Sequence, residues 1–396
     1  MENASINQTD ILNKLNLFYN QTFDTLISEI IKICEIPAPT FEEDARGDYV
    51  KEKLSKINKL AIYKDDAKNI IIRYPGEQKK AKIAILAHLD TVFSFSSIRV
   101  LQQDNKLIGP GIGDNSTSVG ALIHIIESWD SIDYKPPFDV LFVANSCEEG
   151  LGDLKGVKSF FNNYCFNPEN NVELKTLLSI DGTVERVTHI GTGVKRYKIE
   201  IFSKGGHSWA SFGEQESAIH IIGNIIADIS HIKVPEVPKT TYNVGLVEGG
   251  TSVNTIAEYA SIHVDLRSTS DTELSRLDQL LTTIINFHTQ GKKDVESKIT
   301  LVGNRPSGRI PSDHPLVTVI KEAAKDSGLD FIPTSGVAST DANIPLSQNI
   351  PAVAFGCYSG FGAHTNAETI SIESLKKGLP FVNLAILKTI EWIKSL

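Results

Sequence analysis

The 396-residue sequence has little sulfur and no long apolar run. It contains four cysteines and one methionine. The cysteines are widely spaced without a CxxC pair, which indicates reduced, mostly buried thiols, with a disulfide pair as the weaker alternative. Residues 1–20 are polar and lack the apolar segment of a signal peptide. No stretch approaches the roughly 18 apolar residues of a membrane span. These absences predict a soluble, cytoplasmic protein.

Positive charge is also scarce. Lys and Arg total 39 against 48 Asp and Glu, which gives a net charge of -9. An acidic surface repels phosphate backbones and anionic lipids, so neither nucleic acid nor a membrane is an expected partner. The chain is long enough for two domains or one enlarged domain. Its excess carboxylates can be spread over a solvated surface or gathered around a cation, and composition does not separate these possibilities.

Apolar runs alternate with helical patterns in both end portions of the chain. Strands are predicted at 69–74, 82–87, 140–144, 177–180 and 352–355, and helices at 23–36, 41–57, 118–128, 315–326 and 372–396. Thr40 and Glu43 have capping-box spacing at the start of the second helix. The alternation predicts an α/β fold, with a mostly parallel sheet covered by helices on both faces.

The pattern changes near Gly191. Alternating strands are predicted at 194–203, 241–247, 256–266 and 297–302, with helices at 216–230 and 272–290. This strand-helix-strand-strand-helix-strand order is a split βαβ layout that can fold by itself. We therefore expect residues 1–190 and 308–396 to form one domain, interrupted by a ferredoxin-like α+β domain at 191–307.

Five segments bring imidazole or carboxylate side chains to strand ends or to a glycine-rich loop. They contain His88 and Asp90, Asp114, Glu148 and Glu149, Asp181, and His364. Each alone has an ordinary explanation as a polar strand end, a helix cap or a solvated loop. Ligands of open α/β sheets bind beyond the carboxyl ends of the strands, so the five together predict a metal site. Mixed imidazole and carboxylate ligands suit zinc, with cobalt or manganese as alternatives.

The order of these residues resembles the M20 family of co-catalytic zinc metallopeptidases and deacylases. The pattern consists of His88-x-Asp90, Asp114, Glu148-Glu149, Asp181 and, after an insert, His364. The likeness covers nearly the whole chain. It implies a di-zinc exopeptidase-like catalytic domain, and it implies that residues 191–307 act as a lid and dimerisation domain in a homodimer.

The resemblance also implies a role for each site residue. Asp114 would bridge two zinc ions, and its peptide bond to Asn115 would be cis. The remaining ligands would divide into two pairs: His88 with Asp181, and Glu149 with His364. Asp90 would hold the His88 ring, as metal-bound imidazoles usually require. Glu148, left without a metal, would serve as general base and acid.

Further residues of the family pattern would contact substrate. His207, in Gly205-Gly206-His207-Ser208, looks like the lid histidine that helps to hold the oxyanion, although a surface-loop histidine is the plainer alternative. Asn254 and Arg267 would contact a substrate carboxylate or carbonyl, and Arg267 could equally be an ion-pair partner. Asn343 belongs to a loop, Ser339 to Asn343, that would line the pocket.

These features predict an exopeptidase that hydrolyses a terminal amide bond of short peptides, as a di- or tripeptidase or a glutamate-releasing carboxypeptidase. Aspartate at position 181 favours peptidases within the family. The alternative is an N-acyl amino acid deacylase similar to acetylornithine deacetylase or succinyl-diaminopimelate desuccinylase. A catalytically silent binding protein is a third possibility, which the intact Glu148 and five intact ligand positions disfavour.

Overall fold

The computed structural model describes residues 8–396, with side chains from Asp10 onward. Two compact units are distinguished: Thr192–Gly308, and the remainder, which ends at Gly191 and resumes at Arg309. All four cysteines are free and buried, as predicted. Within residues 8–396, no helix combines the length and apolar character that crossing a bilayer requires.

The largest sheet of the described chain has nine strands, in the order β1-β2-β6-β3-β7-β17-β8-β15 with β16 beside β8. Their bounds are β1 (Ala61–Lys64), β2 (Ile70–Tyr74), β3 (Gln78–His88), β6 (Phe138–Asn145), β7 (Val172–Ile180), β8 (Arg186–Gly191), β15 (Gly308–Arg309), β16 (Thr334–Ala338) and β17 (Ala352–Phe355). The central strands β6, β3, β7 and β17 are parallel, whereas β1 and β2 pair antiparallel with their neighbours; β8 is antiparallel to β17 and parallel to β16. β6 is buried along its whole length. The continuous apolar runs of the sequence are therefore the strands covered on both faces.

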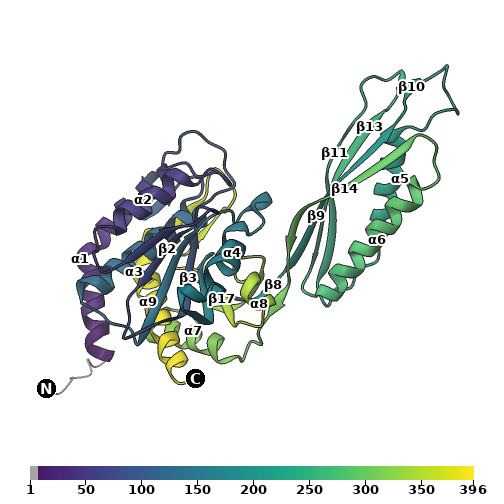
Figure 1. Cartoon of the computed structure of the whole chain (residues 1–396). Helices are drawn as coiled ribbons and strands as arrows, with labels where there is room; N and C mark the ends of the chain where they lie inside the picture. The colour runs from purple at the N-terminus through teal and green to yellow at the C-terminus, as the bar shows by residue number, and fades with distance from the viewer. Residues whose placement is uncertain (1–7) are drawn as a thin grey trace. The chain divides into compact units, whose positions relative to one another are not determined.

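Helices from both ends of the chain cover this sheet (Figure 1). They are α1 (Gln8–Glu35), α2 (Asp44–Leu54), α3 (Ser118–Ser131), α4 (Lys155–Ser159), α7 (Pro315–Asp326), α8 (Asn343–Ser347) and α9 (Ile372–Lys394). α1 packs against α3 and α9, and α9 against α7. The Trp129 indole donates to Asn383 Oδ1 over 2.8 Å, and the Asn383 amide donates to the Tyr19 hydroxyl. These buried bonds explain why α1 begins well before the predicted residue 23.

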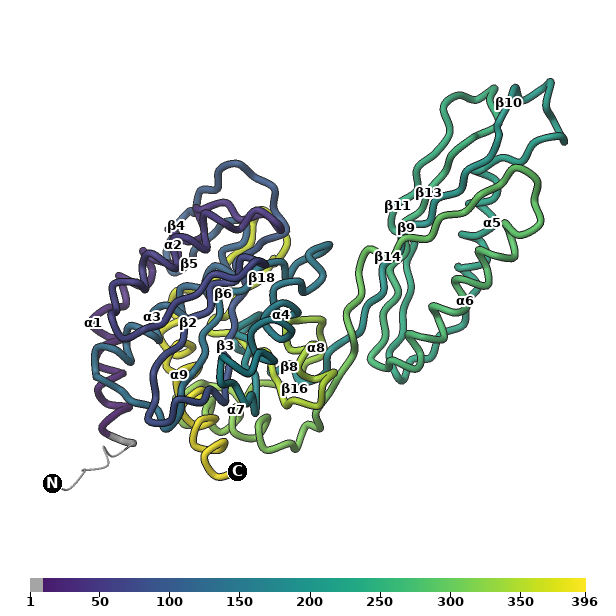
Figure 2. Tube along the Cα trace, in the orientation of Figure 1, coloured from purple at the N-terminus to yellow at the C-terminus, as the bar shows by residue number. Residues whose placement is uncertain are grey.

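Short elements connect these helices and strands. A four-stranded sheet consists of β4 (Leu101–Gln103), β5 (Lys106–Ile108), β18 (Gly360–Phe361) and β19 (Thr369–Ser371), of which β4, β5 and β18 are marked in Figure 2. Single turns form η1 (Ile112–Thr117), η2 (Gly150–Gly152), η3 (Phe160–Cys165) and η4 (Pro168–Asn170). The small sheet joins the segment before η1 to the segment around His364, which brings two distant parts of the predicted site into one region.

The predicted capping box at the start of α2 is wrong. Glu43 is the N-cap residue but makes no side-chain cap bond. Its Oε1 instead accepts hydrogen bonds from the amides of Phe41 and Cys147, over 2.9 and 3.0 Å. The Thr40 hydroxyl donates to Asp90 Oδ2 over 2.9 Å. Both side chains are thus committed to the segments that carry the candidate site.

The inserted unit contains a four-stranded antiparallel sheet in the order β11-β13-β9-β14. Its strands are β9 (Gly193–Ser203), β11 (Thr240–Gly249), β13 (Tyr259–Ser268) and β14 (Val295–Arg305), and a separate pair joins β10 (Gly206–His207) to β12 (Thr255–Ile256). The helices α5 (Ala218–Ser230) and α6 (Asp271–Thr289) pack on one face of the sheet (Figure 1). The strand order is that of the split βαβ layout.

Candidate active site

The carboxyl ends of the parallel strands bring the predicted residues to one edge of the sheet. His88 ends β3 and is in register with Asn145 at the end of β6. Asp181 follows β7, and its amide donates to the Phe355 carbonyl at the end of β17 over 3.1 Å. Because these strands run in the same direction, side chains from distant parts of the sequence meet at this edge.

Asp114 lies between two imidazoles. His88 Nε2 is 3.1 Å from Asp114 Oδ1, and His364 Nε2 is 3.1 Å from Asp114 Oδ2. His364 Nε2 is also 3.0 Å from Glu149 Oε1, and His88 Nε2 is 4.0 Å from Asp181 Oδ1. One carboxylate thus presents a different oxygen to each of two imidazole-containing groups.

The loop that carries Asp114 is held by a buried glutamate. Glu368 is 2% exposed and accepts hydrogen bonds from the amides of Gly111 and Asp114, each over 2.8 Å. A Cβ atom on Gly113 would lie 2.6 Å from the Tyr358 hydroxyl and 2.7 Å from Glu368 Oε1, so this position has room for glycine alone. The Asp114-Asn115 peptide bond is cis, as the resemblance implied.

This set of donor atoms fits a metal centre. Ligand atoms of His88, Asp114 and Glu149 all lie within 4.8 Å of one another. Asp114 Oδ1 is buried and, within the described residues, has no hydrogen-bond partner despite its closeness to His88. His88 Nδ1 is 3.0 Å from the Asp90 carbonyl oxygen, so a neutral ring donates there and directs the Nε2 lone pair toward Asp114. Two lone-pair atoms that face a common point without bonding to each other are suited to a shared cation.

Burial and mutual repulsion perturb the carboxylates of the cluster. Burial, together with the neighbouring charges of Asp114, Asp341 and Glu149, raises the pKa of Asp181 to about 7, although His88 opposes the shift. Burial also acts to raise the pKa of Asp114, but the adjacent imidazoles of His364 and His88 outweigh it and lower the pKa. Contacts with Asp114 and Glu149 raise the pKa of His364 to about 10. Protonated groups thus balance the negative charge of the clustered carboxylates. A metal ion can take the place of these protons when it binds.

Buried side chains hold the turn after β6 through four consecutive backbone amides. The Ser146 amide donates to Asn69 Oδ1 over 3.0 Å, and the Cys147 amide to Glu43 Oε1 over 3.0 Å. The Glu148 and Glu149 amides donate to Asp90 Oδ1 and Oδ2, each over 2.9 Å. These bonds fix the backbone from which both glutamate side chains extend.

The predicted contact between Asp90 and His88 is the weaker of two. The His88 Nδ1 atom is 3.6 Å from Asp90 Oδ1, against 3.0 Å from the Asp90 backbone oxygen. The carboxylate of Asp90 is instead engaged by the amides of the glutamate turn and by Thr40. Asp90 therefore positions Glu148 and Glu149 more directly than it positions His88.

A cavity of about 600 Å³ opens at this edge of the sheet. Its lining includes all the predicted metal ligands and Glu148, together with Glu185, Arg186, Thr188, Val337 and Ser339. Glu148 is 5% exposed, so its carboxylate is largely shielded from bulk water. The cavity thus combines a carboxylate cluster, two imidazoles and a shielded glutamate.

Sequence reasoning missed the buried residues that support this cavity. Glu43, Asn69 and Glu368 hold the backbone of the site through contacts with remote segments. The one signal for Glu43 was its spacing from Thr40, which also fits a capping box. No sequence pattern pointed to Arg186, because it belongs to β8, a strand that the apolar pattern did not predict.

Asn343 does not lie in the cavity wall. Its side chain is fully buried, and its Oδ1 accepts a hydrogen bond from the Thr340 amide over 3.1 Å. It thereby shapes the loop from Ser339, of which Ser339 and Thr340 do line the cavity. This geometry makes Asn343 a support of the wall, where sequence analysis expected a substrate contact.

The inserted unit places His207 next to Asn254. The Ser208 amide donates to the Asn254 carbonyl over 3.0 Å, and His207 pairs with Thr255 between β10 and β12. His207 is exposed, and its Nδ1 lies 3.2 Å from the Trp209 amide and 3.4 Å from the Ala210 amide. Because Nδ1 accepts, the neutral ring carries its proton on Nε2.

Arg267 forms an ion pair within the inserted unit. Its Nε is 2.6 Å from Asp265 Oδ2, and Asp265 Oδ1 is 2.8 Å from Arg196 Nε. This is the ion-pair alternative raised by the sequence.

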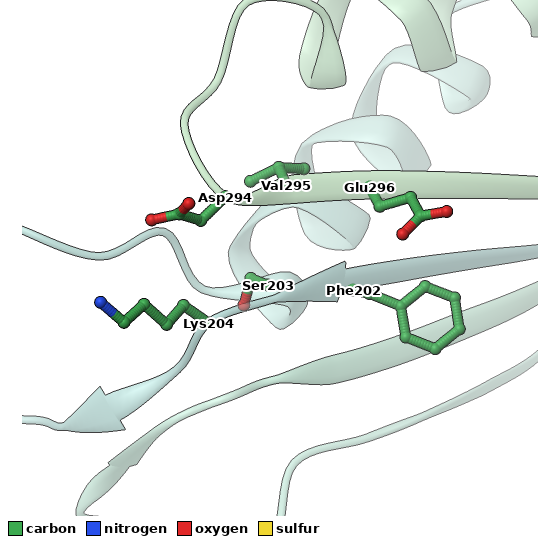
Figure 3. Close-up of a pocket in the computed structure, with 6 residues that line it drawn as sticks. All are labelled: Phe202, Ser203, Lys204, Asp294, Val295 and Glu296. Atoms are coloured by element: carbon green, nitrogen blue, oxygen red, sulfur yellow. The ribbon is translucent and has the colours of Figure 1, made fainter.

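The inserted unit has a hollow of its own, lined by Phe202, Ser203, Lys204, Asp294, Val295 and Glu296 (Figure 3). It contains no imidazole or thiol among its described lining residues, which distinguishes it chemically from the first cavity.

Comparison with known proteins identifies a family. The model of peptidase family M20/M25/M40 matches residues 84–388. A probable carboxypeptidase of Arthroderma benhamiae is 24% identical, over 92% of this chain and 84% of that protein. An acetylornithine deacetylase of Vibrio campbellii is 24% identical, over 77% of this chain and 81% of that protein.

Solved structures show the same fold. A tripeptidase of Staphylococcus aureus is similar with a TM-score of 0.76 and 21% identity, over 93% of this chain and 98% of that one. A dinuclear metal-binding M20 peptidase of Bacillus subtilis has a TM-score of 0.65 and 17% identity, over 94% and 99% of the two chains. The chain belongs to peptidase family M20/M25/M40 and is a metal-dependent hydrolase of peptide or amide bonds.

Proposed function

We propose that the chain is a zinc-dependent exopeptidase that hydrolyses a terminal amide bond of short peptides. The observation that carries this proposal is the position of Asp114 between the imidazoles of His88 and His364, in the cavity that also contains Glu148. Similarity to a tripeptidase and to probable carboxypeptidases supports the choice of peptides as substrates.

The residues divide into two ligand sets that share Asp114. His88 and Asp181 would hold one zinc ion, and Glu149 and His364 the other; cobalt or manganese would suit the same atoms. When bound, the ions supply Lewis acidity and lower the pKa of a coordinated water. Asp90 keeps Glu149 in its ligand position through the backbone amide.

Glu148 is the proposed proton carrier. Its carboxylate accepts a proton from the attacking water and delivers that proton to the departing nitrogen. The Glu148 amide is bound to Asp90, which holds the backbone from which this cavity-lining side chain extends. The low exposure of Glu148 limits exchange of this proton with solvent.

His207 is the proposed donor to the oxyanion. The two amides that donate to Nδ1 keep the proton of the neutral ring on Nε2. That proton is available for donation to a carbonyl oxygen as negative charge develops on it. Asn254 and Arg267 remain candidate substrate contacts. The role of residues 191–307 as a lid and as the contact surface of a homodimer is part of the same proposal.

A substrate panel tests the proposal. Zinc- or cobalt-loaded protein is incubated with dipeptides, tripeptides, blocked peptides, and N-acetyl and N-succinyl amino acids, and release of free amine is measured. Cleavage of short peptides is expected. Cleavage confined to N-acyl amino acids would refute the peptidase assignment and support a deacylase, the kind of enzyme that the Vibrio relative is named as.

Adjacent glutamates provide a matched pair of variants. Glu148→Gln should abolish turnover while the metal content, measured by elemental analysis, stays near that of the wild type. Glu149→Gln should lose metal as well as activity, because a ligand is removed. Equal metal loss in both variants would show that the roles of the two residues are wrongly assigned.

A further inference from the structure

Arg186 is the first residue of β8, and the topology places it at the active edge of the sheet. β8 runs antiparallel to β17, with Thr188 opposite Ala354. β17 is parallel to β7, whose carboxyl end leads to Asp181. The start of β8 therefore lies at the edge where β7 and β17 end.

Alternation along β8 turns Arg186 toward the cavity. Arg186 and Thr188 both line it, whereas Val187 is 0% exposed and His189 3% exposed on the opposite face. Residues two apart share one face of a strand. Arg186 and Thr188 thus form one row along the wall of the cavity that also contains His88 and His364.

Arg186 brings a positive charge to a cavity lining that is otherwise rich in carboxylates. Among the described lining residues it is the one Lys or Arg, against carboxylates that include the neighbouring Glu185. Three other arginines are paired with carboxylates: Arg73 with Asp139, and Arg196 and Arg267 with Asp265. Within residues 8–396, no carboxylate lies in ion-pair contact with the Arg186 guanidinium. An exposed, unpaired guanidinium in an acidic cavity retains its donors for a ligand.

We propose that Arg186 binds the free α-carboxylate of the substrate and so selects peptides or acyl amino acids with an unblocked C-terminus. A guanidinium presents a planar fork of N–H donors that matches the two oxygens of a carboxylate. Thr188 and the Ser339 loop supply hydroxyl groups near this end of the cavity. This inference rests on the proposed function, and it names the substrate end that the proposed function leaves open.

The test compares acids with their amides. The probes are alanyl-alanine, tri-alanine and N-acetylalanine, each against its C-terminal carboxamide. For cleaved acids, Arg186→Met should lower kcat/KM about 10- to 100-fold, the range of a lost charge-assisted hydrogen bond. The amides should change less than about threefold. Arg186→Lys keeps the charge but not the fork and should recover part of the loss. Arg99→Met makes the same change at an exposed arginine outside the cavity lining; it is the matched control and should leave the acid-to-amide ratio near the wild-type value.

Binding separates this inference from the proposed function. Dissociation constants for the same pairs are measured by calorimetry in metal-loaded Glu148→Gln protein, with and without Arg186→Met. If the protein binds acids more tightly than amides and Arg186→Met removes this preference, the inference is supported. It is supported even if no probe is hydrolysed, an outcome that would refute only the proposed function. Hydrolysis with an acid-to-amide ratio unaffected by Arg186→Met overturns the inference and leaves the proposed function standing. Absence of any preference for acids in the wild type also overturns it.

Discussion

Asp90→Asn tests whether one carboxylate positions both glutamates of the site. Asp90 is fully buried, and its two oxygens accept the amides of Glu148 and Glu149. Asparagine retains one oxygen and replaces the other with a donor. The Thr40 hydroxyl can rotate to accept from that new donor, but one backbone amide then faces an NH₂ group without an acceptor.

The expected cost follows from this lost bond. A charge-assisted hydrogen bond contributes about 1.5–3 kcal/mol, and a buried unsatisfied donor costs about 1–3 kcal/mol. We therefore expect Asp90→Asn to lower the free energy of unfolding by about 3 kcal/mol. Because each 1.4 kcal/mol corresponds to about a tenfold rate change, an equal loss of transition-state positioning would lower kcat/KM about 100-fold.

Burial acts to raise the pKa of Asp90, but His88 and the two amides outweigh it and lower the pKa below 3.8. A lowered carboxyl pKa stabilises the folded state above the unfolded value, and this stabilisation disappears as pH falls through the folded value. The difference between wild type and Asp90→Asn should consequently persist from pH 5 to pH 8.

Urea unfolding of the metal-free proteins, with kcat/KM of the metal-loaded ones, provides the assay. Thr40→Val is the matched control, because it removes one hydroxyl bond to Asp90 and leaves both amide bonds; about 1 kcal/mol is expected. If Asp90→Asn is no more destabilised than Thr40→Val and keeps wild-type kcat/KM, the proposed positioning role of Asp90 is incorrect.

Three further outcomes are expected. Gly113→Ala should destabilise the protein and reduce metal content, because the added Cβ would lie 2.6 Å from the Tyr358 hydroxyl; unfolding and elemental analysis measure both. Glu43→Gln should lower kcat more than it raises KM, since the Cys147 amide, in the turn that carries Glu148, loses its carboxylate acceptor; a change in KM alone would contradict this. Hydrogen bonds to Asp114 and Glu149 raise the pKa of His364 from 6.5 to about 10, so they stabilise the metal-free protein fully below pH 6.5 and progressively less up to pH 10. Its Tm should fall across that window, and His364→Gln should flatten the fall.

The predictable part of the site is the part that follows strands. His88 and Asp181 come directly after apolar runs and Glu148 follows one by four residues, and the direction of parallel strands is enough to gather them. The order of these residues also carries the family resemblance, which the match to residues 84–388 confirms.

The unpredicted part depends on contacts between remote segments. Thr40 and Glu43 have a spacing with a local meaning, yet their side chains bond to Asp90 and Cys147 in the folded chain. Glu368 follows His364 by four residues, but its function of holding the Asp114 loop depends on backbone amides that sequence patterns do not reveal. The strand β8 was missed because its six residues lie in a segment without a clear apolar run.

The span of the proposed ligand set along the chain has a consequence for biosynthesis. His88 lies in the first quarter of the chain and His364 close to its end, and the intervening ligands come from separate strands and loops. A ribosome-bound chain that stops before His364 lacks the imidazole on one side of Asp114, and it also lacks α9, which packs against α1. A nascent chain therefore cannot complete the proposed metal site until the segment that contains His364 has been synthesised.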